Sequence, residues 1–333
     1  MRCGRNGEHM YLGIDYGANN VKYAVLDGST LLGLGSIQRV RGQTLSDVLG
    51  DVVLDRGLPR LRHVPRVVVA NSATLLHDTH RAGLMALERE LRQAFPAADI
   101  RMVSATFNLV PLARWTSVPL ETLIGTNFAG SAYYGASLVE NGVVVDVGTS
   151  STDVIGVKDG KPRLIAASDN LFNRLATQEL WMAGGIYTYA DYVAPRVSWH
   201  GFSVPLVPGV LRMVHVLYQL GLIDEQYLER EIGFAGPVSH HQALARATGY
   251  DASMVSGDDI RALAAAVLAA FRGRIELMVS HVRDALQIHD PQVAALGFAG
   301  QAATALLSPV VPPEPLKEPL SAYGAAMLGR DKW

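Results

Sequence analysis

Cysteine, long apolar runs and excess charge are all scarce in this chain. Cys3 is the single cysteine among 333 residues, which excludes an internal disulfide framework and any zinc site built on cysteines. No apolar run approaches the roughly 20 residues of a membrane-spanning helix. A formal net charge of −2 offers no electrostatic attraction to nucleic acid. We therefore expect a cytoplasmic protein that binds neither nucleic acid nor a membrane.

The short motifs of several enzyme classes are also absent. None of the ten histidines lies in an HExxH or another strong metal-binding spacing. The motifs GxSxG and GxxxxGK[ST] do not occur, so a serine hydrolase or a P-loop enzyme has no support here. Residues 1–10 lack the apolar segment of a secretory signal, and we expect them to form a flexible leader.

The most informative stretch is residues 143–160, VVVDVGTSSTDVIGVKDG. Three valines lead into Asp146, which is followed by Gly148, four hydroxyl residues and Asp153. The stretch ends in Asp159-Gly160, a dipeptide typical of a two-residue hairpin turn. A buried strand followed by a tight polar loop is expected, with a carboxylate at the tip of the strand. An ordinary hairpin with a polar turn is the alternative.

Residues 12–28, LGIDYGANNVKYAVLDG, repeat this pattern near the N-terminus. Asp15 matches Asp146 and Gly17 matches Gly148 at one common offset, and the second loop is longer by one residue. Two copies predict two related lobes whose loops face a shared cleft. With 49% hydrophobic and 18% charged residues, each lobe can bury a full core. Chance similarity of two hairpins is the alternative.

Such loops are suited to binding phosphate. Backbone N–H groups and hydroxyls around a small loop can hold phosphate oxygens, and carboxylates can hold Mg²⁺ directly or through water. The residues that we expect to bind a diphosphate or nucleotide in the two loops are Gly17, Asn19, Asn20, Gly148, Thr149, Ser150, Ser151 and Thr152.

Further candidates lie outside the two loops. Asn71 follows a short buried strand at 66–70 and is either a ligand contact or part of a turn or cap. Asn127 opens a predicted helix at 126–138, where it either caps the helix or contacts substrate. Gly297 and Gly300 end a predicted strand at 293–300, where backbone can approach a ligand closely. Residues 168–191, polar and then aromatic, either cover a substrate or form a surface helix and loop.

Local patterns predict the remaining elements. Ser256-Gly-Asp-Asp259 fits a capping box that opens a long helix to about residue 288. Further strands are expected at 31–40 and 100–104. Further helices are expected at 45–56, 81–95, 210–220, 224–232, 240–248 and 320–328.

The two loops resemble the phosphate motifs of the actin–hexokinase–heat-shock-chaperone superfamily, and the glycines at 297–300 resemble its nucleoside-side motif. The second loop is most similar to the hydantoinase/oxoprolinase branch. Within that branch, the size and order of segments resemble the tetrahydromethanopterin-linked one-carbon pathway proteins, whose characterised members are methanofuran-type coenzyme synthases. The resemblance implies an α/β fold of two ribonuclease-H-like lobes around a central cleft. The expected parts are the leader (1–10), a first lobe (11–130) and a second lobe (131–333) with a helical insertion at about 168–255.

Members of this family join an aminomethylfuran methyl diphosphate to the phenol oxygen of a tyramine or tyrosine derivative, with release of diphosphate. The resemblance implies that Asp15 and Asp146 hold Mg²⁺, possibly through water, and that Lys22 neutralises the leaving group. Asp153 is the candidate base for the phenol proton; the alternative is that it caps its own loop. Asn71 and Asn127 are the candidate substrate contacts.

This sequence departs from the family pattern after the second loop. The segment at 178–188 has altered threonine and arginine positions, and Pro208 stands where the family has an acidic helix start. A synthase with another phenolic acceptor explains these changes, as does a non-catalytic partner subunit of an active paralogue. An ATP-dependent kinase or hydantoinase-like enzyme is a third hypothesis, with ATP in the loops. We expect a homo-oligomer or a hetero-oligomer with a homologous subunit.

Overall fold

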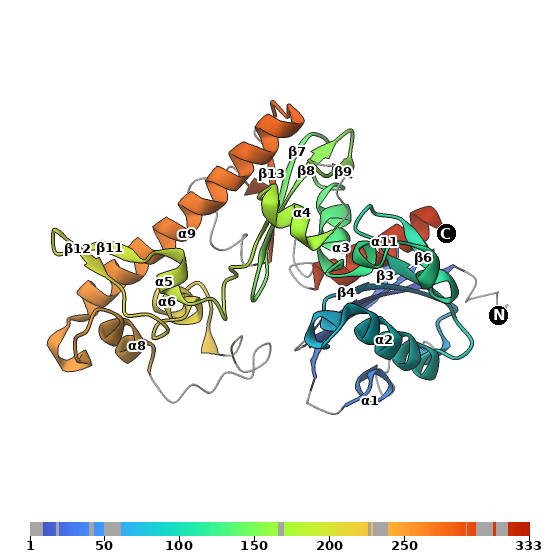
Figure 1. Ribbon diagram of the computed structural model, residues 1–333, viewed down its shortest axis with the longest axis horizontal. Coiled ribbons are helices and arrows are strands. Elements are labelled where there is room, and N and C mark those ends of the chain that lie inside the picture. The colour runs from blue at the N-terminus through green and yellow to red at the C-terminus, as the bar shows by residue number, and fades with distance from the viewer. Residues whose placement is uncertain are drawn as a thin grey trace. The chain divides into compact units, whose positions relative to one another are not determined.

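The computed structural model describes residues 9–17, 20–39, 43–49, 61–165, 170–225, 228, 239–290, 292–297, 309–310 and 319–333 (Figure 1). The chain divides into two compact units. The first unit comprises residues 1–140, 157–177 and 312–333, and the second comprises residues 141–156 and 178–311. The sequence suggested a boundary at residue 130 between a first lobe and a second lobe that runs to residue 333. In this division the C-terminal helix groups with the first unit.

A six-stranded sheet forms the centre of the first unit, in the order β3-β2-β1-β4-β5-β6. The first three strands are antiparallel, β4 and β5 run parallel to β1, and β6 returns antiparallel. The strands are β1 (Met10–Tyr16), β2 (Asn20–Asp27), β3 (Thr30–Gln38), β4 (Arg66–Asn71), β5 (Asp99–Val103) and β6 (Leu109–Pro111). The expected strands at 31–40, 66–70 and 100–104 are confirmed to within two residues.

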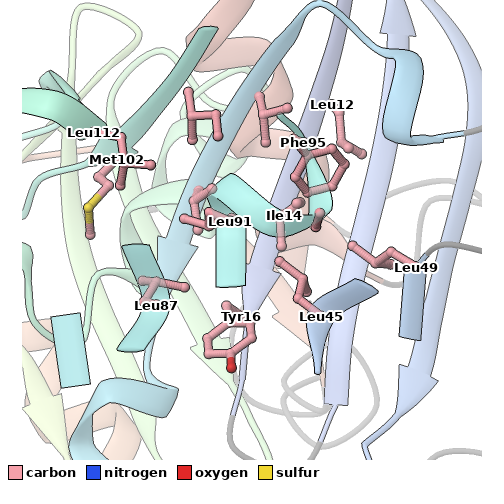
Figure 2. Close-up of a cluster of buried hydrophobic side chains, with 14 of the residues drawn as sticks. Leu12, Ile14, Tyr16, Leu45, Leu49, Leu87, Leu91, Phe95, Met102 and Leu112 are labelled. Atoms are coloured by element: carbon pink, nitrogen blue, oxygen red, sulfur yellow. The ribbon is translucent and has the colours of Figure 1, made fainter. Parts of the chain in front are cut away.

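One face of this sheet packs on helices α1 (Leu45–Leu49) and α2 (His80–Ala94). Alternate residues of β1 point to this side, and Figure 2 shows them against side chains of both helices. Helix α2 begins at Thr79, whose hydroxyl accepts a hydrogen bond from the N–H of Ala82. The strand and helix pattern of the sequence therefore builds one apolar core, in which the labelled residues are Leu12, Ile14, Tyr16, Leu45, Leu49, Leu87, Leu91, Phe95, Met102 and Leu112.

The opposite face of the sheet packs on α3 (Asn127–Gly135) and α11 (Leu320–Lys332). Glycines permit this close approach. A Cβ atom on Gly13 would overlap the carbonyl oxygen of Ala322, and one on Gly324 would overlap that of Gly130. Backbone-to-backbone packing of this kind holds α11 in the first unit, which is why the second lobe does not extend to residue 333. Short turns η1 (Leu61–His63), η2 (Ala73–Leu76), η3 (Leu112–Ser117), η4 (Leu120–Leu123) and helix α4 (Leu171–Ala176) complete the unit.

The second sheet repeats the topology of the first. Its order is β10-β8-β7-β13-β14, and β9 also pairs with β8. Strand β13 runs parallel to β7, and β14 runs parallel to β13. The strands are β7 (Gly142–Val147), β8 (Thr152–Lys158), β9 (Lys161–Arg163), β10 (Leu180–Trp181), β13 (Val293–Gly297) and β14 (Pro309–Val310). The order β9-β8-β7-β13-β14 corresponds to β3-β2-β1-β4-β5, which confirms the mixed α/β fold with two ribonuclease-H-like sheets.

The hairpin turns of the two sheets differ in type. Asp159 and Gly160 have φ values of 53° and 63°, as a type I′ turn requires. In the first hairpin Asp27 pairs with Thr30, and of the two turn residues between them only Gly28 has a positive φ, of 58°. The predicted turn at Asp159-Gly160 is therefore confirmed.

Helices of the second unit surround the long helix α9 (Gly257–Leu286), drawn in orange in Figure 1. Its capping box is confirmed, because Ser256 and Asp259 each bind the other's backbone N–H. The other elements are α5 (Ala190–Val193), β11 (Arg196–Trp199), β12 (Phe202–Pro205), α6 (Met213–Gln219), α8 (His240–Ala247) and the turn η6 (Ala252–Met254). The expected helical insertion is thus of mixed structure. Most of the helix expected at 224–232 lies outside the described residues.

No helix in the described ranges combines the length and apolarity that a membrane span requires.

Candidate functional site

The second loop (residues 148–151) is a tight turn with unused hydrogen-bond donors. The N–H of Gly148 donates to the carbonyl oxygen of Ser151 at 2.9 Å and closes the turn. The next three residues, Thr149, Ser150 and Ser151, donate neither their N–H groups nor their hydroxyls to any described residue. Three amides and three hydroxyls are therefore available on one short turn, which is the donor set of an anion-binding loop.

A second segment fixes this loop from behind. The N–H of Gly185 donates to the carbonyl oxygen of Gly148 at 2.9 Å, and the N–H of Tyr187 donates to that of Thr149 at 3.0 Å. Gly184 lies so close that a Cβ atom there would be 2.5 Å from both the Gly148 oxygen and the Ser150 nitrogen. These bonds engage the carbonyl oxygens of Gly148 and Thr149, whereas the N–H groups of Thr149, Ser150 and Ser151 have no partner among the described residues. The signal for this contact in the sequence is the pair of consecutive glycines at 184 and 185.

Thr152 and Asp153 lie beyond the loop, inside β8. The Thr152 side chain is fully buried and its hydroxyl donates to the carbonyl oxygen of Ala183 at 2.7 Å, so its proton is engaged within the protein. Asp153 is buried opposite Leu180 of β10. Its place in the strand, past the loop, is compatible with either role that the sequence left open, and the assignment as a base stays a prediction.

The structure brings Asp146 and Gly297 together. Asp146 is half-buried near the end of β7, and β13 lies beside it in register. Gly297 has a φ of 56°, and a Cβ atom on it would lie 2.6 Å from the Val147 oxygen and 3.1 Å from Oδ1 of Asp146. Only glycine fits this approach, because both its conformation and its space exclude a side chain. Gly300 lies outside the described residues.

The first loop (residues 17–20) has the same closing hydrogen bond as the second. The N–H of Gly17 donates to the carbonyl oxygen of Asn20 at 3.1 Å, as Gly148 does to Ser151. A Cβ atom on Gly17 would lie 2.6 Å from that oxygen. The closing hydrogen bond is therefore repeated in the two loops, as the sequence is. Asn20 is half-buried at the start of β2, and Asn19 lies outside the described residues.

Asp15 is a buried carboxylate with one oxygen left unsatisfied. Oδ2 accepts a hydrogen bond from the hydroxyl of Ser321 at 2.5 Å, and the Lys22 ammonium, opposite in register, lies 4.0 Å away. Oδ1 is buried and has no hydrogen-bond partner among the described residues. An unsatisfied buried carboxylate oxygen is costly unless a cation or water completes it.

This arrangement fits Mg²⁺, which keeps most of its waters and binds through one or two carboxylates. Within the described part of the chain, no group of three or more histidine, cysteine or acidic side chains could hold a metal by itself. Ser321 is separated from Asp15 by 306 positions, and no local pattern in the sequence pointed to it.

The side chains of Asn71 and Asn127 differ in their hydrogen bonds. Asn71 is fully buried, donates to the carbonyl oxygen of Leu123 at 2.9 Å and accepts from Thr74 at 2.6 Å, so it joins two turns. This supports the turn alternative. Asn127 is the first residue of α3 and not its N-cap, which is Thr126. The half-buried Asn127 side chain makes no hydrogen bond with the described residues.

No family model and no curated protein matches the chain. Several solved structures do. The activator of the 2-hydroxyisocaproyl-CoA dehydratase from Clostridium difficile, with bound ADPNP, is 14% identical and has a TM-score of 0.50. The match covers 97% of this chain and 94% of that one.

Two further structures show the same likeness. Component A of the (R)-2-hydroxyglutaryl-CoA dehydratase from Acidaminococcus fermentans is 14% identical, with a TM-score of 0.50 and coverage of 97% and 98%. A nucleotide-free acetone carboxylase is 12% identical, with a TM-score of 0.52 and coverage of 95% and 70%. Together with the repeated sheets, this likeness shows that the chain has the α/β fold of the actin–hexokinase–chaperone type.

Proposed function

We propose that the chain is a Mg²⁺-dependent enzyme that binds the diphosphate group of an organic substrate at the second loop and displaces it. The observation that supports this most is the set of three N–H groups and three hydroxyls on residues 149–151 with no partner among the described residues. Donors fixed in advance stabilise the charge that develops on a leaving diphosphate and need no reorganisation during reaction.

Residues of the chain have distinct roles in this proposal. The amides of the second loop hold the diphosphate oxygens, and Lys22 neutralises their growing charge. The resemblance implies that Asp15 and Asp146 would hold Mg²⁺ through its waters, and the ion would supply Lewis-acid stabilisation of the leaving oxygen. The bond from carbon to the diphosphate oxygen breaks with its electron pair leaving on that oxygen, and a new bond forms from the attacking hydroxyl oxygen to the same carbon. Asp153 takes the proton of the attacking hydroxyl.

We propose further that the transferred group is a furfuryl-type methylene and that the acceptor is a phenol, in biosynthesis of a methanofuran-type carrier. An electron-rich furan stabilises a carbocation-like methylene, so the protein need only bind, orient and withdraw charge. This finer assignment rests on the sequence resemblance to the hydantoinase/oxoprolinase branch and its methanofuran-type synthases.

ATP is a second candidate ligand for the same loops. The Clostridium difficile activator was solved with bound ADPNP, and the acetone carboxylase is described as ATP-dependent. A kinase or hydantoinase-like reaction would use the same N–H donors for the β- and γ-phosphates. A partner-subunit role is the third candidate, and the departures at 178–188 and at Pro208 favour it.

Turnover separates these candidates. The purified chain is mixed with Mg²⁺, an aminomethylfuran methyl diphosphate and tyramine or tyrosine, and released diphosphate is measured with and without ATP. We expect diphosphate release without ATP, accompanied by an ether product seen by mass spectrometry. Turnover that requires ATP would contradict the transferase and support the ATP-dependent enzyme. Absence of turnover that is restored by adding a paralogous subunit would support the partner role.

A further inference from the structure

Arg212 places a half-buried positive charge beside aromatic rings in the second unit. Its guanidinium donates to the hydroxyl of Tyr189 at 3.2 Å and lies 5.1 Å from the centre of that ring. No aspartate or glutamate among the described residues forms an ion pair with it. Half-buried arginines are stabilised by bidentate contact with an oxyanion, and this one has none within the described chain.

The groups around Arg212 are neutral at physiological pH. Burial raises the pKa of Tyr187, while the positive charge of Arg212 opposes that change. Burial, His240 and Arg212 together lower the pKa of His215 to about 4, so its imidazole carries no charge at pH 7. Arg212 is thus the positively charged member of this cluster, and the carboxylate of Glu225 acts on His240, which lies 3.1 Å from His215.

Backbone hydrogen bonds connect this cluster to the second loop. Tyr187 donates its N–H to the carbonyl oxygen of Thr149 at 3.0 Å, and the N–H of Met213 donates to that of Thr188 at 2.8 Å. The N–H of Val214 donates to Ile186 at 3.3 Å. Residues 186–189 thus lie between the second loop and the segment that carries Arg212, and they hold both in one body.

We propose that Arg212 and Tyr189 form an oxyanion-binding subsite next to the second loop, for a carboxylate or phosphate group on a small molecule. The fork of Arg212 matches either group, because both present two oxygens in one plane. Tyr189 holds the guanidinium by a cation–π contact and by its hydroxyl, and Tyr187 is near enough for the charge of Arg212 to act on its phenol. The subsite requires nothing of the reaction at the loop, so it stands separately from the proposed function.

The test compares two probes on four proteins by calorimetric titration. The probes are 4-hydroxyphenylpropionate and inorganic phosphate, with the neutral 4-hydroxyphenylpropionamide as a control ligand. The proteins are the wild type, Arg212→Gln, Arg212→Lys and Arg196→Gln. Arg196 is a matched control, because its guanidinium donates to Ser203 within the hairpin of β11 and β12.

We expect the wild type to bind one of the two anions. If the carboxylate is the preferred group, the wild type should bind the neutral amide at least tenfold more weakly than 4-hydroxyphenylpropionate. Arg212→Gln should weaken anion binding tenfold or more, Arg212→Lys should weaken it less, and Arg196→Gln should not change it. Preference for phosphate over the carboxylate identifies phosphate as the bound group.

Three results would overturn the subsite. The first is a wild type that binds neither anion, and the second is an Arg212→Gln variant that binds the anion as tightly as the wild type. The third is phosphate binding that survives Arg212→Gln and is lost in Gly184→Ala, since that result places the bound phosphate at the second loop. Circular dichroism and thermal melts establish that Arg212→Gln is folded, and Tyr189→Phe provides a milder variant with an expected loss of severalfold. Binding of Mg²⁺-diphosphate by Arg212→Gln, measured in parallel, tests the proposed function independently.

Discussion

Asp15 has two carboxylate oxygens in different situations. Oδ2 receives the Ser321 hydroxyl, and Oδ1 is buried without a partner among the described residues. The sequence predicted Asp15 as a metal-binding residue from its repeat with Asp146. It contained no sign of Ser321, because the hydrogen bond joins the first strand to the last helix. Local motifs identify a carboxylate, whereas the group that orients it depends on the tertiary fold.

Ser321→Ala should weaken Mg²⁺-dependent diphosphate binding about tenfold or more, because groups that orient a metal-binding carboxylate typically contribute 10- to 100-fold to affinity. Calorimetric titration with Mg²⁺ and diphosphate measures this. Ser117→Ala is the control, since the exposed Ser117 hydroxyl also donates one hydrogen bond, to the Arg114 carbonyl oxygen. Equal affinity of Ser321→Ala and Ser117→Ala would contradict a role for Ser321 in positioning Asp15.

His215 predicts a pH dependence of stability. Its Nδ1 lies 3.1 Å from Nδ1 of His240, and burial, His240 and Arg212 lower its pKa to about 4. The ordinary histidine pKa of about 6.5 applies in the unfolded chain. The unfolded state therefore binds more protons, and stability present above pH 6.5 is lost as the pH falls from 6.5 to 4, by up to about 3 kcal/mol.

Urea melts of the wild type and His215→Gln between pH 7.5 and pH 4.5 measure this dependence. We expect the free energy of unfolding to fall more steeply with decreasing pH in the wild type than in the variant. Parallel pH profiles would contradict the burial of a neutral imidazole at this position.

The packing of α11 against α3 and β1 depends on glycines at the contact. Gly130, Gly324 and Gly13 permit backbones to touch where a side chain would not fit. The sequence predicted both helices from local pattern, and each is found. It did not predict that α11 packs in the first unit, because helical periodicity shows which residues are apolar and not which sheet they meet.

Gly324→Ala should destabilise the protein by about 1–3 kcal/mol, the usual cost of inserting a carbon atom into a filled contact. Gly273→Ala, inside α9 with open space around it, should stabilise by about 0.5–1 kcal/mol, because alanine favours a helix. Thermal and urea melts of both variants are compared with the wild type. A Gly324→Ala protein as stable as Gly273→Ala would contradict the close approach of the two backbones.

Elements with strong local signals were predicted well, whereas one short hairpin was missed. The capping box at Ser256 and the Asp159-Gly160 turn are formed by neighbouring residues, and both are confirmed. The β11–β12 hairpin was not predicted, because its strands are short and partly exposed. The alternative that Asn127 caps α3 is wrong by one position, since Thr126 is the cap and the sequence does not show that.

Across the whole chain, the repeated loops led to the correct fold. The repeat of Asp-x-Gly with its flanking strands predicted two related sheets, and the two strand orders agree with that prediction. The closing bond from Gly17 to Asn20 matches that from Gly148 to Ser151. The sequence did not predict that residues 157–177 and 312–333 belong to the first unit. Local sequence patterns do not show which distant segments pack together.

The sequence predicts that Asp15 and Asp146 hold one magnesium ion, and a double-mutant cycle tests this prediction. If the two carboxylates bind one ion, the first substitution already removes its site. The double variant Asp15→Asn, Asp146→Asn should then have the same affinity for Mg²⁺-diphosphate as the single variant with the lower affinity. Losses that add in free energy would contradict a shared ion and indicate two independent sites.

The measurement that tests the second loop most directly is calorimetric titration of Mg²⁺-diphosphate into the wild type, Gly184→Ala and Gly273→Ala, with Mg²⁺-ATP in parallel. A Cβ atom at Gly184 must displace the Gly148 carbonyl and the Ser150 amide, so we expect Gly184→Ala to lose diphosphate binding tenfold or more while remaining folded. Gly273→Ala should bind as the wild type does. Diphosphate binding that Gly184→Ala retains in full, or a wild type that binds no phosphate ligand, would contradict the assignment of residues 148–151 as the phosphate-binding loop.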